Sequence, residues 1–483
     1  MHFRVIQSVL GIMLILFSVT LLVPAGVGVL LDDPTVEPFV RGFWILLLVG
    51  LGLWLPVRRQ SSELRLRDGF LVVVSCWTVV GLAGSLPLLF SPEAGLTLTD
   101  AVFESFSGLT TTGATVMIGL DELPRSILFY RQQLQWLGGM GIILLAVAIL
   151  PMLGIGGMQL YRAETPGPVK DNKLTPRIAE TAKTLWLIYI GLTIACALAY
   201  YAAGMSFFDA VGHSFSTVSI GGFSTHDASI GFFESATIEM VAVFFMLISA
   251  ANFGLHFVAW RRKSLLPYWR DAEFVGYVSL IALIASITVG YLMYTRTFGD
   301  WFSAFHHGLF QTVSIATTTG FTTAEYFNWP GFLPTLLLFA SFVGGCAGST
   351  GGGIKVVRVL LLLKQGAREL QRLVHPSAFF AVKIGRKALD ERVIEAVWGF
   401  FSAYVAVFVL IMLFLMATGL DQVTAFSATA ATMNNLGPGL GDVGANFANV
   451  NDPAKWALCL AMLMGRLEVF TVLVLFTPTF WRH

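Results

Sequence analysis

The sequence predicts an all-α polytopic membrane protein, in which an N-terminal helix hairpin precedes four helix–pore-helix–filter-turn–helix repeats around a pseudo-fourfold pore. Three observations lead to this prediction: an apolar composition, basic loops that alternate with acidic ones, and a fourfold internal repeat. Of the 483 residues, 56% are hydrophobic and 12% are charged, which is about half the charged share of a soluble domain. Apolar runs of about 20 residues recur along the chain, and each can cross a hydrocarbon core as a helix. Runs of this length argue against an outer-membrane barrel.

The charged residues indicate the topology. Basic residues cluster in four loops, 58–67, 162–183, 261–270 and 364–387. Acidic residues mark two of the intervening loops: Asp32, Asp33 and Glu37 in one, and Asp121 and Glu122 in the other. The positive-inside rule places the basic loops, and with them the N-terminus, in the cytoplasm. Because the basic loops alternate with spans, topology explains them better than nucleic-acid binding does.

Two apolar runs, Val9–Leu30 and Gly42–Leu55, form the first unit, 1–60. The first run is too long for a signal peptide and has no small-residue cleavage signal, so we expect a retained helix. We interpret the pair as a peripheral hairpin. The four cysteines, Cys76, Cys196, Cys346 and Cys459, lie in apolar stretches without metal-ligand spacing, which is typical of packing residues.

One pattern then recurs four times: a long apolar helix, a shorter segment, a glycine-bearing turn and a second long helix. The copies are 69–153, 183–260, 273–363 and 392–479, and they align on Gly113, Gly222, Gly320 and Gly437. Six positions before each glycine stand Ser107, Ser216, Ser314 and Ala431. The short segment, of about 12 residues, cannot span a bilayer, so it is predicted to be a re-entrant pore helix. Near its four starts stand Asp100, Asp209, Asp300 and Asp421, which we interpret as helix caps.

Four such turns brought together would enclose an aqueous path, because irregular backbone at membrane depth must be buried or line a cavity. Their carbonyl oxygens can replace the hydration shell of a cation, and the negative ends of the pore helices favour positive charge. No ring of carboxylates accompanies the turns, which argues against a calcium-type pore. The turns differ in sequence, so we expect monovalent selectivity that is less sharp than with identical loops. Glu104, His213 and Gln311 share one pore-helix register and are expected to form hydrogen bonds rather than bind ions.

The chain resembles the TrkH/TrkG/KtrB superfamily of potassium-uptake proteins, and its bacterial TrkH branch most, over essentially its whole length. The segments that carry the resemblance are Thr110–Ala114, Ser219–Thr225, Ala316–Phe321, Asn434–Gly441, Gly344–Lys355 and Gly465–Glu468. The resemblance implies potassium uptake across the bacterial inner membrane, with potassium as the transported ion and symport as the mode, the coupling ion being left open. It implies potassium binding at Thr111, Thr112, Gly113, Ile220, Gly221, Gly222, Thr318, Thr319, Gly320, Asn435, Leu436 and Gly437.

Two features are candidate gates. A glycine-rich run interrupts the second helix of the third copy, at Gly344, Gly345, Gly348, Gly351, Gly352 and Gly353. Glycine is unfavourable inside a helix, so the run predicts a break, and a close helix-packing site is the alternative. It is not a phosphate-binding loop, because Lys355 lacks the neighbours of that motif. The second feature is Arg466 in the last span, where a charge is costly and usually faces the protein interior. The resemblance implies that the run is an intramembrane gating loop, to which we add Lys355, and that Arg466 obstructs the pore.

Other classes fit less well. Gly439-Leu440-Gly441-Asp442 resembles one motif of an intramembrane aspartyl protease, but that chemistry needs paired carboxylates. We therefore expect no enzyme. A carrier with inverted repeats is a second alternative, although all four turns here are predicted to face outside. The resemblance also implies a homodimer and a cytoplasmic TrkA-type ring that binds nucleotides. We expect docking at Lys364–Pro376 and Gly154–Pro176, contact with membrane lipid, and no nucleic-acid partner.

Overall fold

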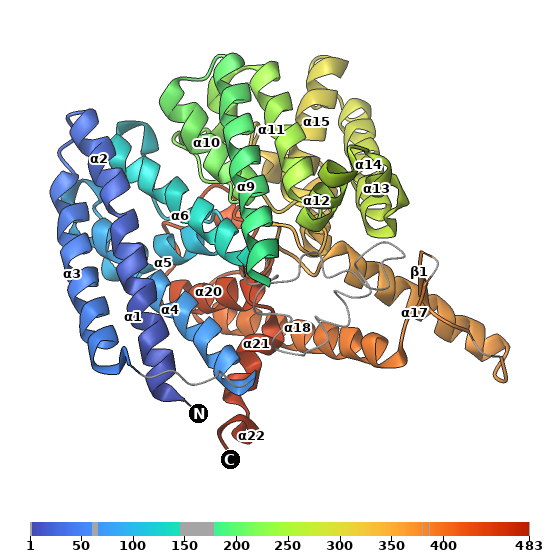
Figure 1. Cartoon of the computed structure of the whole chain (residues 1–483). Coiled ribbons are helices and arrows are strands. Elements are labelled where there is room, and N and C mark those ends of the chain that lie inside the picture. The colour runs from blue at the N-terminus through green and yellow to red at the C-terminus, as the bar shows by residue number, and fades with distance from the viewer. Residues whose placement is uncertain (1, 60–65, 145–177, 379, 386, 483) are drawn as a thin grey trace.

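The computed structural model describes residues 2–59, 66–144, 178–378, 380–385 and 387–482. Their regular secondary structure is almost entirely helical (Figure 1). The exception is a short antiparallel hairpin of β1 (Lys383–Ile384) and β2 (Lys387–Ala388) in a basic loop. The all-α prediction is confirmed. The end of the first predicted repeat and the proposed docking loop Gly154–Pro176 lie outside the described residues.

The N-terminal hairpin consists of α1 (Phe3–Thr20), α2 (Leu22–Leu30) and α3 (Val36–Trp54), which stand together at one edge of the molecule (Figure 1). Gly11 and Gly50 bring α1 and α3 close, since a Cβ atom on Gly11 would lie 2.8 Å from the Gly50 carbonyl oxygen. The acidic turn attaches the hairpin to the first repeat. The Asp33 carboxylate accepts a hydrogen bond of 3.0 Å from the amide of Ser126.

The four repeats follow in chain order. The first contains α4 (Leu66–Phe90), α5 (Leu98–Leu109) and α6 (Arg125–Leu144), and the second α9 (Ile178–Ala202), α10 (Phe207–Ser219), α11 (Ala236–Ser249) and α12 (Phe253–Arg262). After the connecting helix α13 (Leu266–Arg270), the third contains α14 (Ala272–Tyr294), α15 (Trp301–Ala316), α16 (Leu333–Val343) and α17 (Val356–Val374). The fourth contains α18 (Glu391–Ala417), α19 (Gln422–Met433), α20 (Asp452–Arg466) and α21 (Val469–Leu473), and α22 (Pro478–Trp481) ends the chain. Among the described residues, six helices are long and apolar enough to cross a membrane, or up to eight if each bent pair is one span.

In the part of the chain that the structure describes, the second helix breaks in the second, third and fourth repeats, although the sequence predicted a break only in the third. The helix pair Ala236–Ser249 and Phe253–Arg262 is bent by 93° at its break, and the pair Asp452–Arg466 and Val469–Phe476 is bent by 114°. The break after α11 has a long-range cause: the Ala250 carbonyl accepts the amide of Cys346, from the glycine-rich run, at 2.8 Å. Asn252 then caps α12 through a bond of 2.7 Å from the amide of Gly254. Hydropathy cannot detect a break that a distant backbone group imposes.

The pore helices α5, α10, α15 and α19 begin with side-chain caps. Asp300 and Asp421 are N-caps, as predicted. In the first two repeats the prediction was wrong, because Thr97 and Ser206 are the caps and the aspartates lie three residues further on. There each cap hydroxyl accepts the aspartate amide and donates to the aspartate carboxylate. Both arrangements satisfy amides of the first helical turn.

Candidate functional site

The four pore helices end in one backbone conformation. Two residues before each turn glycine stands a residue in the left-handed region, and the glycine also has a positive φ. The left-handed residues are Thr111, Ile220, Thr318 and Asn435, with φ of 50°, 56°, 68° and 52°. The glycines are Gly113, Gly222, Gly320 and Gly437, with φ of 80°, 81°, 85° and 100°. This conformation costs a residue with a side chain about 1–2 kcal/mol, so its recurrence indicates that the fold requires the bend.

Matching hydrogen bonds fix these turns. The amide of the residue before each glycine donates to a carbonyl of its own pore helix, at 2.8 Å in every copy. The pairs are Thr112 with Ser107, Gly221 with Ser216, Thr319 with Ser314, and Leu436 with Ala431. This is the six-to-one bond of a Schellman motif, in which the left-handed residue ends the helix. The acceptors are the four residues that the sequence aligned at one register.

The turns close into a ring in chain order. A Cβ atom on any turn glycine would collide with the carbonyl oxygen before the glycine of the next repeat. The pairs and separations are Gly113 with Gly221 (2.1 Å), Gly222 with Thr319 (2.0 Å), Gly320 with Leu436 (2.1 Å) and Gly437 with Thr112 (2.8 Å). The last pair joins the fourth repeat to the first. Glycine is therefore required here for close contact between repeats as well as for its φ, and one carbonyl oxygen lies at each junction.

In each repeat, a side chain of the pore helix also forms a hydrogen bond with the segment that follows the turn. The Glu104 carboxylate accepts the amide of Val116 at 2.9 Å, and His213 Nε2 lies 2.8 Å from the Ser224 hydroxyl. The corresponding pairs in the third and fourth repeats are Gln311 with the Thr323 amide (3.2 Å) and Ser427 with the Leu440 amide (2.9 Å). The expectation that Glu104, His213 and Gln311 form hydrogen bonds is confirmed.

Two residues of α6 brace the ring, and sequence reasoning missed both. Arg131 is 1% exposed and donates from Nε to Glu104 at 2.8 Å. Gln135 donates to the Gly221 carbonyl at 2.6 Å and accepts the Phe223 amide at 3.1 Å. The available signal was a run of polar residues within an otherwise apolar span. Because Gln135 bonds residues on both sides of Gly222, this side chain restrains a turn that contains two glycines.

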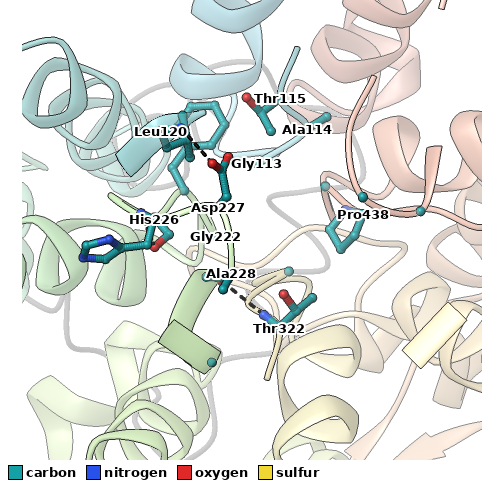
Figure 2. Close-up of a pocket in the computed structure, with 18 of the residues that line it drawn as sticks. Gly113, Ala114, Thr115, Leu120, Gly222, His226, Asp227, Ala228, Thr322 and Pro438 are labelled. Carbon is teal, nitrogen blue, oxygen red and sulfur yellow. Dashed lines mark hydrogen bonds between the residues drawn. The ribbon is translucent and has the colours of Figure 1, made fainter. Parts of the chain in front are cut away.

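A cavity of about 360 Å³ opens on one side of the ring. It is bordered by the glycines of all four turns and by the residues that follow them (Figure 2). Two carboxylates, Asp227 and Glu325, also line it. Asp227 accepts the amide of Leu120 at 2.9 Å, which links the loops that leave the first and second turns (Figure 2).

His226 joins the same two loops at the edge of this cavity. Its Nδ1 lies 2.5 Å from Asp121 and its Nε2 lies 3.4 Å from Asp209. The His226 imidazole also stacks on the Phe232 side chain, with the two ring centroids 3.5 Å apart. Burial alone would lower the pKa of His226, but the hydrogen bond to Asp121 and the charges of both aspartates outweigh it and raise the pKa above 6.5. The protonated form of the His226 imidazole is therefore stabilised between the two carboxylates.

The glycine-rich run lies against the opposite side of the ring, where it touches residues that precede the turn glycines. The amide of Gly352 donates to the Thr318 hydroxyl at 2.7 Å, and that of Gly353 donates to the Asn434 carbonyl at 3.1 Å. A Cβ on Gly352 would come within 1.9 Å of that carbonyl oxygen. The predicted break is confirmed, because α16 ends at Val343 and α17 begins at Val356.

The glycines of the run have two different roles. Gly344, Gly348 and Gly353 have φ of 68°, 71° and 76°. Gly345 and Gly351 instead allow close approach, since their Cβ atoms would lie 3.0 Å from the Ala250 oxygen and 3.1 Å from the Thr317 oxygen. The sequence left a broken helix and a close-packing site as alternatives, and the run is both.

Two cations flank the run. Arg466, at the end of α20, is 7% exposed. Its Nη2 donates to the Thr111 hydroxyl at 2.6 Å and to the Thr350 carbonyl at 2.9 Å, so it links the first turn to the glycine-rich run. Lys355 is directed back into the run, where its Nζ donates to the Gly351 carbonyl. Both cations therefore lie at the ring or the run, and neither extends away from them.

Glu468 stands two residues after Arg466, but its ion-pair partner is a different arginine. Glu468 Oε1 lies 2.6 Å from Nη2 of Arg358 on α17. The guanidinium of Arg358 also covers the ring of Phe400 at 4.4 Å. Glu468 has φ of 63° and stands at the break after α20. This pair joins that break to the helix that follows the glycine-rich run.

The aspartate of the protease-like motif lies at the surface, after the fourth turn. Asp442 is exposed in a short 3-10 helix, and its amide donates to the Thr424 hydroxyl at 3.1 Å.

Four re-entrant turns in a closed ring, a cavity on one side and a glycine-rich run on the other define a multi-pass helical membrane protein of the pore type. The chain belongs to the TrkH family, described as "Cation transport protein", which it matches over residues 36–482. This is a family of cation transport proteins and not of enzymes. The membership predicted from the sequence is confirmed.

Named relatives are similar over their whole length. The chain is 61% identical to the Trk system potassium uptake protein TrkH of Vibrio parahaemolyticus, with 100% of both chains covered. It is 58% identical to that of Salmonella typhimurium, again with 100% of both covered. The crystal structure of the potassium transporter TrkH from Vibrio parahaemolyticus superposes with a TM-score of 0.93 at 58% identity over 100% of both chains.

Proposed function

We propose that this protein takes up potassium across the bacterial inner membrane through a gated, channel-like pore. The observation that carries the proposal is the closed ring of four turns, in which each turn glycine touches a carbonyl of the next repeat. Backbone oxygens are the ligands with which filters replace the hydration shell of potassium. The names of the similar proteins, which are potassium uptake proteins, support potassium as the ion.

The proposed filter consists of each turn glycine and the two residues that precede it. These are Thr111, Thr112 and Gly113, then Ile220, Gly221 and Gly222, then Thr318, Thr319 and Gly320, and finally Asn435, Leu436 and Gly437. The turns are unequal, because Gln135 braces the second and Asn435 donates to the Thr112 hydroxyl at 2.9 Å. This inequality supports moderate selectivity among monovalent cations.

The gate is the glycine-rich run together with Lys355 and Arg466. In the observed state the run donates hydrogen bonds to Thr318 and Asn434, and it accepts one from Arg466. A cation at this point also repels potassium electrostatically. Opening requires that the run leave these partners, and its glycines allow that change of backbone conformation.

The N-terminus lies on the cytoplasmic side. His2 bonds Asp68 at 2.8 Å, and Arg67 donates to the carbonyl of Arg482 at 2.7 Å. Both termini therefore lie beside the first basic loop, which the positive-inside rule assigns to the cytoplasm.

Partners dock on the cytoplasmic side as well. The end of α17 projects from the molecule (Figure 1) and exposes Leu363, Leu370, Leu373 and Val374 beside its basic residues. An exposed apolar surface of this kind is typical of protein contacts. We assign it to a second copy in a homodimer or to a TrkA-type nucleotide-binding ring.

Ion flux into liposomes that contain the purified protein tests the proposal. We expect uptake of potassium and rubidium to exceed that of sodium, and flux to follow the applied voltage as in a channel. Equal flux of all three ions would overturn the filter. Flux that requires a fixed ratio to a second ion, independent of voltage, would favour symport by a carrier.

A further inference from the structure

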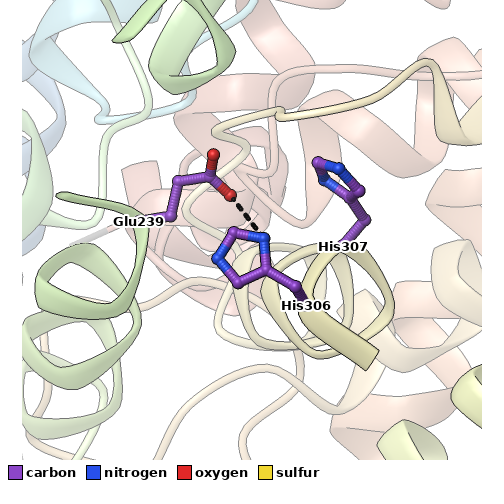
Figure 3. Close-up of side chains that lie close together, drawn as sticks. All are labelled: Glu239, His306 and His307. Atoms are coloured by element: carbon purple, nitrogen blue, oxygen red, sulfur yellow. Dashed lines mark ion pairs between the residues drawn. The ribbon is translucent and has the colours of Figure 1, made fainter. Parts of the chain in front are cut away.

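Three metal-binding side chains come together away from the ring and the glycine-rich run. Glu239 lies in the first turn of α11, and His306 and His307 lie in α15, so the cluster joins the second and third repeats (Figure 3). One ligand atom from each lies within 4.8 Å of the others. Neither the filter nor the gate uses these residues.

The cluster is buried and incompletely satisfied. Glu239 is 3% exposed and His306 is 7% exposed, while His307 is half-buried. Glu239 Oε2 and His306 Nε2 are buried without a hydrogen-bond partner among the described residues. Glu239 Oε2 does lie 3.3 Å from His306 Nδ1 (Figure 3), but the geometry is not that of a hydrogen bond. A buried carboxylate is costly unless a cation or donor compensates it.

One distance in the cluster matches the ligand separation around a tetrahedral metal ion. Ligands at about 2.0–2.1 Å from zinc are about 3.3 Å apart in a tetrahedron, which is the separation of Glu239 Oε2 and His306 Nδ1. His307 Nδ1 lies 3.0 Å from the Thr323 hydroxyl, which leaves Nε2 of that ring for a metal. Metal-binding histidines are commonly oriented by such a bond from the second nitrogen.

We propose that Glu239, His306 and His307 bind a divalent transition metal of the zinc class, with water as the fourth ligand. Two imidazoles and one carboxylate favour zinc, cobalt or nickel over magnesium and calcium, which prefer oxygen ligands alone. Because Thr323 also lines the cavity beside the ring, the bound metal fixes α11 and α15 together next to the third turn.

Binding of Co²⁺ and Zn²⁺ to the purified, chelator-treated full-length protein tests the proposal. We expect one high-affinity Zn²⁺ per chain, a visible absorption band of tetrahedral Co²⁺ that Zn²⁺ abolishes, and a Tm that rises with Zn²⁺ concentration. Excess Mg²⁺ should not compete. Glu239→Gln and His306→Gln should each weaken binding at least tenfold, whereas His375→Gln, at an exposed histidine of the C-terminal end of α17, should bind as the wild type does.

The metal-free Tm of each variant separates lost binding from lost folding. His307→Gln is the second variant, because this half-buried side chain can be replaced with less disturbance than the other two. Wild-type affinity in folded His306→Gln and His307→Gln proteins would overturn the site, and so would a wild-type protein that gives no tetrahedral Co²⁺ band.

Discussion

Replacing Arg466 with alanine should increase potassium flux, because this side chain holds the glycine-rich run against the ring. One nitrogen, Nη2, donates both to the Thr350 carbonyl of the run and to the Thr111 hydroxyl of the first turn. The substitution removes both bonds and the positive charge beside the filter. It leaves the pore helices, their caps and the ring contacts unchanged.

The size of the effect follows from the one bond that joins Arg466 to the run. A hydrogen bond to a charged group contributes about 1.5–3 kcal/mol. Since about 1.4 kcal/mol changes an equilibrium tenfold, the run should be released about 10- to 150-fold more often. Thr111→Val should have a smaller effect, because it removes the bond to the turn and keeps the bond to Thr350.

Potassium flux into liposomes, normalised to correctly inserted protein, measures this change. Arg125→Ala is the matched control, since that arginine is exposed at the start of α6 and its aromatic contact is Phe208 at 5.7 Å. Unchanged or reduced flux in folded Arg466→Ala protein would mean that other contacts alone hold the run, and that Arg466 is not part of the gate.

Two further predictions concern stability. Glu104→Ala leaves the buried Arg131 without its carboxylate partner, so the substitution should destabilise the protein by about 3–5 kcal/mol. Thermal unfolding of the detergent-solubilised protein measures this loss of stability. An unchanged Tm would argue against a stabilising role of the Glu104–Arg131 pair. The raised pKa of His226 means that its bridge to Asp121 and Asp209 stabilises the fold fully below pH 6.5 and is lost as pH rises through the folded-state pKa. Tm should therefore fall on alkalinisation in the wild type more than in His226→Gln; parallel curves would contradict the bridge.

The repeats were predictable from the sequence because their turns depend on local rules. A pore helix that ends in a Schellman motif needs a fixed spacing between its last turn and its glycine, and that spacing recurs at Gly113, Gly222, Gly320 and Gly437. The glycine-rich run was predictable for the same reason, since many glycines in one helix weaken it wherever they occur.

The missed features depend on residues far apart in the chain. The break after α11 requires the amide of Cys346, and the break after α20 accompanies the pairing of Glu468 with Arg358. A sequence pattern shows that Arg358 is charged but does not show which helix approaches it. Gln135 was missed for the same reason, because its partners on the second turn are about 90 residues away.

The potassium-to-sodium flux ratio of Gly113→Ser, measured beside that of Gly119→Ser, shows whether the four turns select the ion. Both glycines have a left-handed φ, 80° and 71°, so both substitutions strain the backbone. A side chain at 113 would meet the Gly221 oxygen at 2.1 Å, whereas one at 119 would meet nothing within 4 Å. We expect Gly113→Ser to lose the preference for potassium and Gly119→Ser to keep it. A wild-type ratio in folded Gly113→Ser protein would contradict the account.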